Sequence, residues 1–100
     1  MAKILIIDDE RAIRNTLKEI LEFEGYTVEV AENGRAGLDR ALTGAYDLIF
    51  TDIKMPEMDG MEFMAKYREG MAQQNSEEAP VVVITGHGSV DTAVEALKGG

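Results

Sequence analysis

Four short apolar runs, each followed by a segment with helical spacing of its apolar residues, constrain the fold of this chain more than any other feature. The runs are rich in Ile, Leu and Val and are too short for helices, so we interpret them as buried strands. The predicted strands cover residues 3–9, 26–30, 48–51 and 81–85. The predicted helices cover residues 13–25, 33–44, 60–68 and 89–98. Strands that alternate with helices indicate an α/β fold with a parallel sheet and helices on both faces.

Turn and cap residues support these boundaries. Gly25 is expected to end the first helix, and Asn33 has the side chain of an N-cap for the second. Residues 70–79 are mostly polar and predict a mobile loop between the third helix and the fourth strand.

The composition is that of one globular domain and excludes several kinds of partner. At 100 residues the chain is at most a single domain, and its net charge of -9 argues against direct binding to nucleic acid or to an anionic membrane. The chain has no cysteine, and its single histidine, His87, cannot form a zinc site alone. Its apolar runs are too short to span a bilayer, so we expect a cytoplasmic protein.

Polar side chains stand where the predicted strands end. Asp8 and Asp9 end the first strand, Asp52 the third and Thr85 the fourth. Because the carboxyl ends of parallel strands lie at one edge of the sheet, we expect these side chains to meet in one crevice. Solvated acids that merely start helices are a simpler interpretation of one such residue, but three acids and a hydroxyl at matching strand ends favour a functional site.

The chemistry of such a site follows from the repulsion of its charges. Two carboxylates about 4 Å apart repel by ~4 kcal/mol at an effective dielectric constant of about 20, so a bound cation or a proton must neutralise the cluster. Oxygen ligands without His or Cys favour Mg²⁺. Beside this cation Asp52 could act as a nucleophile toward a phosphoryl group, and Thr85 could donate a hydrogen bond to that group.

These residues give the chain a resemblance to a known family. The acidic pair Asp8-Asp9, Asp52 within "DIKMPEMDG" and Thr85 within "VVVITGHG" resemble the motifs of response-regulator receiver domains of two-component signalling. The resemblance covers the whole chain and implies a flavodoxin-like, doubly wound parallel sheet with strand order 2-1-3-4. The stretch "ITGHGSVDTAVEALKGG" looks most like receivers of nitrogen-regulation-type, sigma-54-dependent transcriptional activators.

The resemblance also implies a metal site and a phosphoacceptor. Asp52 would accept the phosphoryl group of a sensor histidine kinase. Asp9 and Asp52 would bind Mg²⁺ directly, the backbone carbonyl of Lys54 would be a further ligand, and Asp8 would act mostly through water. The domain would catalyse only its own phosphorylation and dephosphorylation, without turnover of a separate substrate.

Further residues would transmit or time the signal. Thr85 would move toward the phosphoryl group and report its presence to an output domain or downstream protein. Lys54 and His87, two residues past Asp52 and Thr85, would tune the lifetime of the phosphoryl group. Any binding of DNA would belong to another part of the protein, because this part is strongly acidic.

The chain departs from the family pattern at its C-terminal end. Receivers have a fifth strand and helix, with a lysine that pairs with the acids and an aromatic residue that couples to the threonine. This chain ends at Gly100, before either residue, so we expect residues 1–100 to be a truncated receiver domain whose natural protein continues. The chain could also be the ordered part of a longer one, or it could be completed by strand exchange with a second copy, as a homodimer. Without the lysine, we expect weak Mg²⁺ binding and weak switching.

Two other functions fit parts of the pattern. A receiver-like interaction module that works without phosphorylation would keep the fold, and treatment with a small phosphodonor would discriminate it. A magnesium-dependent phosphatase with an aspartyl nucleophile is the second, but such enzymes carry Asp-x-Asp on the first strand. Asp8 and Asp9 are adjacent and on a strand would face opposite ways.

Overall fold

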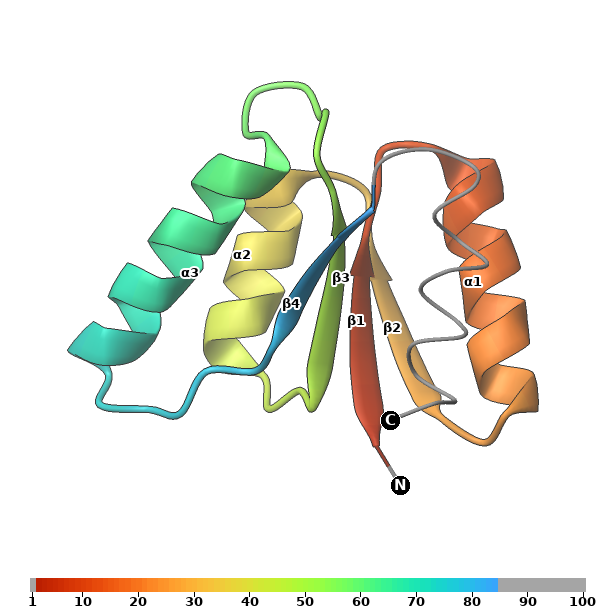
Figure 1. The fold of residues 1–100 in the computed structure, drawn as a ribbon, viewed down its shortest axis with the longest axis horizontal. Coiled ribbons are helices and arrows are strands. Elements are labelled where there is room, and N and C mark those ends of the chain that lie inside the picture. The colour runs from red at the N-terminus through yellow and green to blue at the C-terminus, as the bar shows by residue number, and fades with distance from the viewer. Residues whose placement is uncertain (1, 85–100) are drawn as a thin grey trace.

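The computed structural model describes residues 2–84, which form a single four-stranded parallel sheet with helices on both faces (Figure 1). The strands lie in the order β2-β1-β3-β4, which confirms the predicted order. Their bounds are β1 Lys3–Ile7, β2 Thr27–Ala31, β3 Leu48–Asp52 and β4 Val81–Ile84. The register pairs Ile7 of β1 with Thr51 of β3, so the carboxyl ends of the two central strands lie side by side.

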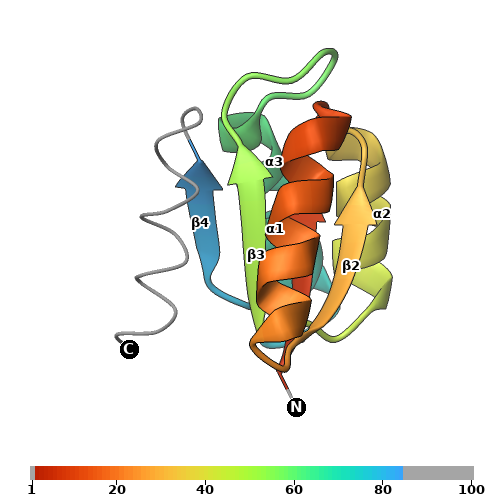
Figure 2. The same ribbon diagram turned by 90° about the vertical axis from the view of Figure 1, so that its right-hand side faces the viewer.

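Three helices cover the sheet in the described part of the chain. Their bounds are α1 Arg11–Phe23, α2 Gly34–Thr43 and α3 Gly60–Gln73. Helix α1 lies on one face, and α2 and α3 lie together on the other (Figures 1 and 2). None of these three helices is long and apolar enough to cross a membrane. The predicted helix over residues 89–98 lies outside the described residues.

Alternation along the central strands divides the core into two layers. Ile4 and Ile6 of β1 pack with α1, whereas Leu5 and Ile7 pack on the side of α2 and α3. All four side chains are fully buried. A parallel strand buried on both faces must be apolar at every position, which is why the sequence of β1 is a continuous apolar run. This rigid central strand delivers Asp8 and Asp9 to the edge of the sheet.

The helix boundaries follow the local signals in the sequence. The side chain of Asn33 accepts a hydrogen bond from Ala36 N at 2.8 Å, which confirms the predicted N-cap of α2. Asp59 caps α3 in the same way through Glu62 N, also at 2.8 Å. Gly25 follows the end of α1 with φ of 96°, a conformation that favours glycine.

Several predicted boundaries differ from the structure, and the ends of α3 and β1 are the two that matter most for packing and for the site. Helix α3 continues to Gln73, so residues 70–73 of the predicted loop are helical. The reason is that Met71 extends the buried row of Phe63 and Tyr67 at four-residue spacing, and this burial outweighs the low helix propensity of Gly70. In addition, β1 ends at Ile7 and not at Asp9.

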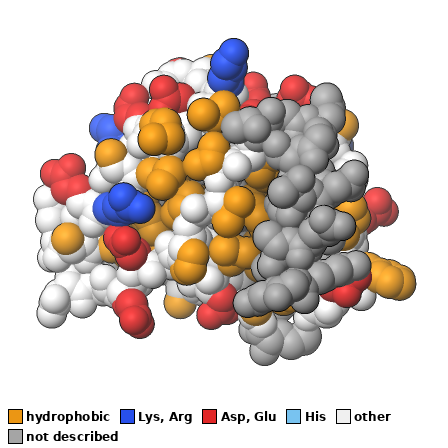
Figure 3. All heavy atoms as spheres, in the orientation of Figure 1, with side chains coloured by type: hydrophobic (Ala, Val, Ile, Leu, Met, Phe, Trp, Pro, Cys, Tyr) orange, Lys and Arg blue, Asp and Glu red, His pale blue; other side chains and the backbone are white. Residues whose placement is uncertain are grey.

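The outer strand β4 lies at an edge of the described sheet. Val81, Val82 and Val83 are only half-buried. In the space-filling view of Figure 3, hydrophobic side chains gather across the middle of this face, near α3 and β4. An apolar edge of this kind can pair with another strand.

One buried tyrosine joins α3 to the segment that leads into β4. The ring of Tyr67 stacks on Phe63 with 5.8 Å between ring centroids. Its hydroxyl oxygen accepts a hydrogen bond from Ala79 N at 2.8 Å, and both residues are buried. This hydrogen bond satisfies a backbone donor that water cannot reach, so it fixes the start of β4 against α3.

We expect Tyr67→Phe to lower the free energy of unfolding by about 1–3 kcal/mol, because the buried N–H of Ala79 would lose its acceptor. Urea unfolding followed by circular dichroism measures this. Tyr26→Phe is the matched control, since the Tyr26 hydroxyl forms no hydrogen bond within residues 2–84. Equal stabilities of the two variants would contradict the assignment.

Candidate functional site

Three carboxylates meet at the carboxyl ends of the central strands. Asp8, Asp9 and Asp52 each offer an oxygen, and these oxygens all lie within 4.8 Å of one another. The acidic pair follows β1 directly, and Asp52 is the last residue of β3. The structure therefore confirms that these three acids lie close together, as expected from the strand ends.

The two adjacent acids do not face opposite ways. The alternation expected for Asp8 and Asp9 is wrong, because β1 ends at Ile7 and the chain turns immediately afterwards. Asp8 is 1% exposed and lies inside the cluster, while Asp9 reaches the same cluster from the solvent side. The turn thus converts a sequential pair into two groups that can contact one ion.

Hydrogen bonds hold the turn in place around Asp8. Its backbone N–H still donates to Ala31 O of the neighbouring strand at 3.2 Å. Its side-chain Oδ1 accepts from Glu10 N at 2.8 Å, and its carbonyl oxygen accepts from Arg14 Nη1 at 2.7 Å. The other carboxylate oxygen, Oδ2, is buried and has no hydrogen-bond partner among the described residues.

Burial is the main influence on the titration of these acids. It raises the pKa of Asp8 from 3.8 to about 6, although the N–H of Glu10 acts against it, and the charges of Asp52 and Asp9 raise it further. Burial also raises the pKa of Asp52. There the backbone N–H groups of Ile53 and Lys54 act against it and stabilise the charged form.

The loop after β3 is shaped to hold Asp52. The N–H of Ile53 donates to Asp52 Oδ1 at 2.8 Å and lies 3.3 Å from the Ile84 carbonyl at the end of β4. Gly60 N–H closes the loop by donating to the Ile53 carbonyl at 2.9 Å. A Cβ atom on Gly60 would overlap the backbone oxygen of Asp52, so only glycine fits there.

A tight turn lies further along the same loop. Met58 N–H donates to the Pro56 carbonyl at 2.7 Å, and Glu57 between them has φ of 68°. These features are those of a γ-turn, a strained conformation for a non-glycine residue. The side chains of Met55 and Met58 are buried on either side and hold the turn against the core. Lys54 lies on the same loop with its side chain exposed.

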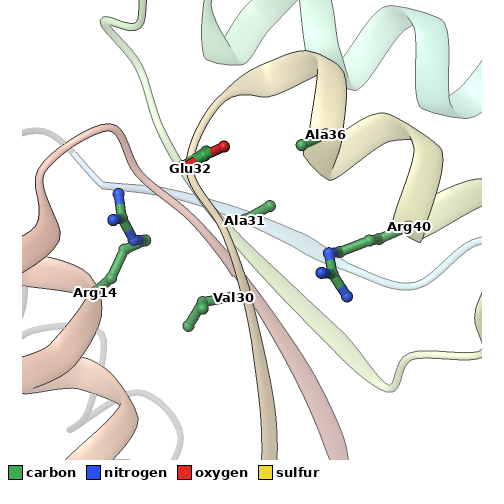
Figure 4. Close-up of a pocket in the computed structure, with 6 residues that line it drawn as sticks. All are labelled: Arg14, Val30, Ala31, Glu32, Ala36 and Arg40. Carbon is green, nitrogen blue, oxygen red and sulfur yellow. The ribbon is translucent and has the colours of Figure 1, made fainter.

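Asp9 of the site lines one of two neighbouring depressions that share Arg14 and Glu32. One, of about 360 Å³, is lined by Asp9, Asn33, Pro56 and Glu57 together with the shared pair. The other, of about 270 Å³, lies over β2 between α1 and α2 (Figure 4). The first depression gives the exposed Asp9 carboxylate access to a molecule that approaches from solvent.

The donor set fits Mg²⁺. It consists of carboxylate oxygens without sulfur or imidazole, and hard oxygen ligands suit this ion. The buried Oδ2 of Asp8 lacks a partner, and the pKa values of Asp8 and Asp52 are raised. A divalent cation would give Asp8 Oδ2 a partner, and its charge would lower the pKa values of both acids. Of the other residues expected here, Thr85 and His87 lie outside the described part of the chain.

Sequence reasoning did not find the backbone donors or the role of Arg14. Arg14 contacts the Asp8 carbonyl, a role that the sequence motifs do not indicate. The only hint of this role in the sequence is that Arg14 lies six residues after Asp8, near the start of the first helix. The N–H groups of Glu10 and Ile53 have no signature in the sequence.

Comparison with known proteins agrees with this geometry. The family model described as response regulator receiver domain matches residues 4–100. The chain belongs to this family. It is 36% identical over 98 residues to the response regulator MprA of Mycolicibacterium vanbaalenii, a match that covers 98% of the chain and 40% of that relative. The chain thus spans less than half the length of this curated relative.

Solved structures of receivers have the same fold. A response regulator receiver domain protein from Clostridium thermocellum is 34% identical, with a TM-score of 0.74 over 100% of this chain and 77% of that one. The response regulator TrrA from Thermotoga maritima, solved in complex with Mg²⁺ and BeF, is 37% identical, with a TM-score of 0.74 over 87% of this chain and 71% of that one. The flavodoxin-like receiver fold predicted from the sequence is confirmed.

The buried acid makes the metal-free receiver less stable at neutral pH. Asp8 titrates near 3.8 when unfolded and at about 6 when folded, so folding favours its protonated form. That contribution is complete below pH 3.8 and is lost as the pH rises through about 6. Asp8→Asn keeps a neutral side chain at every pH. We therefore expect it to raise the free energy of unfolding in EDTA by on the order of 1–3 kcal/mol at about pH 7.5.

Urea unfolding at several pH values measures this difference, which should disappear in strong acid. Asp39→Asn is the control for net charge, since Asp39 is exposed on α2. A stabilisation by Asp8→Asn that is no larger than that of Asp39→Asn would contradict the prediction.

We expect Gly60→Ala to destabilise the domain by about 1–3 kcal/mol, because the new methyl group overlaps the Asp52 carbonyl and must displace the loop. Thermal unfolding measures the loss. Gly70→Ala is the control, since its methyl group would meet only the end of the Leu42 side chain, which can rotate. A loss for Gly60→Ala no larger than for Gly70→Ala would show that the loop accommodates the methyl group.

Proposed function

We propose that Asp52 accepts a phosphoryl group from a sensor histidine kinase in a Mg²⁺-dependent reaction, and that its phosphorylation signals to an output domain or downstream protein. The observation that supports this most is the convergence of Asp8, Asp9 and Asp52 at the ends of β1 and β3. In a member of the receiver family, such a cluster joins a nucleophile to a site for a hard cation.

Each acid has a separate role in the proposal. Asp9 and Asp52 would bind Mg²⁺ directly, with the backbone carbonyl of Lys54, and Asp8 would act mostly through water. Bound Mg²⁺ would neutralise the cluster and the incoming phosphoryl oxygens. A carboxylate oxygen of Asp52 would attack phosphorus as the bond between phosphorus and the kinase imidazole nitrogen breaks, and that nitrogen would keep the electron pair. The N–H of Ile53 would hold the Asp52 carboxylate in a fixed rotation during the attack.

The remaining assignments stay predictions from the sequence. Thr85 would bind the phosphoryl group and relay its presence, and His87 and Lys54 would tune its lifetime. The nitrogen-regulation subtype rests mainly on residues 85–100, which the structure does not describe, and the curated relative reported above is named MprA. We propose that residues 1–100 belong to one receiver domain.

The partners of the whole protein are part of the proposal. A sensor kinase and an output domain fit a family whose curated members extend well beyond the matched part. A cytoplasmic location follows from the kinase partner. The half-buried valines at the edge of β4 support pairing with another strand, either of the same chain or of a second copy.

Intact mass after incubation with Mg²⁺ and acetyl phosphate tests the proposed function. We expect one phosphoryl adduct on the chain, none after Asp52→Asn, and none when EDTA removes Mg²⁺. Asp39→Asn, which removes an exposed acid of α2 that is not part of the cluster, should leave the adduct unchanged.

A different acceptor would be shown by an adduct that persists in Asp52→Asn. The absence of an adduct both here and in a chain that continues past Gly100 would contradict the proposal. It would support instead an interaction module that works without phosphorylation.

A further inference from the structure

Arg14 holds the backbone from which the acidic pair projects. It lies in the second turn of α1, half-buried, and its Nη1 donates to the Asp8 carbonyl oxygen at 2.7 Å. A hydrogen bond from a guanidinium group is charge-assisted and stronger than one between neutral groups. Figure 4 shows Arg14 on the α1 side of β2, close to the loop that leaves β1.

The Asp8 carbonyl is the group that decides where Asp9 points. Because the peptide unit is planar, fixing this oxygen fixes the plane that joins Asp8 to Asp9. The N–H of Asp8 and its Oδ1 are already bound, to Ala31 and Glu10. The bond from Arg14 completes the restraint on this residue and sets the start of Asp9, whose side chain is exposed.

We propose that Arg14 is a positioning residue for the metal site. By holding the Asp8 carbonyl, it directs the Asp9 carboxylate into the cluster with Asp8 and Asp52 instead of outward along the strand direction. This inference rests on the proposed Mg²⁺ site and goes beyond it, because it assigns a role in metal binding to a cation that cannot itself be a ligand.

The positive charge of Arg14 distinguishes a positioning role from a purely electrostatic one. The residue lines the same depression as Asp9. If its only effect on the cluster were electrostatic, removing its positive charge would strengthen Mg²⁺ binding, since like charges repel. If it positions Asp9, removing it weakens Mg²⁺ binding. The two roles therefore predict changes of opposite sign.

The experiment is a Mg²⁺ titration of the chain and its variants by isothermal titration calorimetry, with thermal unfolding in EDTA as the check of folding. We expect Arg14→Gln to weaken Mg²⁺ binding roughly tenfold, the size typical of lost support for a metal ligand. Arg14→Lys, which keeps a charged donor on a long stem, should recover part of this loss. If Arg14→Gln fails to fold, Arg14→Met, which keeps the aliphatic stem, carries the same expectation.

Arg11→Gln is the matched control. Arg11 is exposed at the first position of the same helix, so its substitution removes the same charge without the contact to Asp8. It should leave Mg²⁺ binding unchanged or strengthen it. Binding by Arg14→Gln as tight as in the unsubstituted chain, or tighter, would overturn the role of Arg14 and leave the metal site intact. An unsubstituted chain that binds no Mg²⁺ would instead overturn the metal site, and this inference with it.

Discussion

The mutual repulsion of three carboxylates at the ends of β1 and β3 is the constraint on which the rest of the site depends. Asp8, Asp9 and Asp52 are brought within 4.8 Å by strands that are too well packed to move apart. Burial first, and the charges of the neighbouring acids second, raise the pKa values of Asp8 and Asp52. A divalent cation at this cluster would remove the cost of this repulsion, which supports the metal site proposed above.

The two-layer core stabilises the fold enough to offset the cost of placing the acids close together. Every side chain of β1 from Ile4 to Ile7 is fully buried, alternately against α1 and against α2 with α3. At about 1.5–3 kcal/mol for each large apolar side chain buried, these few residues outweigh the ionisation cost of one acid. The strand can therefore end in a buried acid without unfolding the domain.

The sequence was sufficient for the parts of the fold that depend on periodicity. Continuous apolar runs and helical spacing predict the alternating strands and helices and the convergence of the strand-end acids. The strand order 2-1-3-4 was implied by the resemblance to receiver domains. The direction of Asp9 could not be predicted, because it depends on where β1 stops and on what holds the Asp8 carbonyl. The end of α3 was not predicted because the residues around Met71 are mostly polar, and they gave no indication that Met71 is buried in the core. Thr85 and His87 stay predictions, since they lie outside the described residues.

The amide hydrogen of Ile53 is divided between two acceptors: Asp52 Oδ1 at 2.8 Å and the carbonyl of Ile84 at 3.3 Å. Such three-centre bonds respond to the basicity of each acceptor. Any event that draws electron density from Asp52, whether protonation, metal binding or esterification, makes it a poorer acceptor and favours the carbonyl that ends β4. Because Asp52 and the end of β4 share one hydrogen-bond donor, a chemical change at the acid would also change a hydrogen bond of the outer strand.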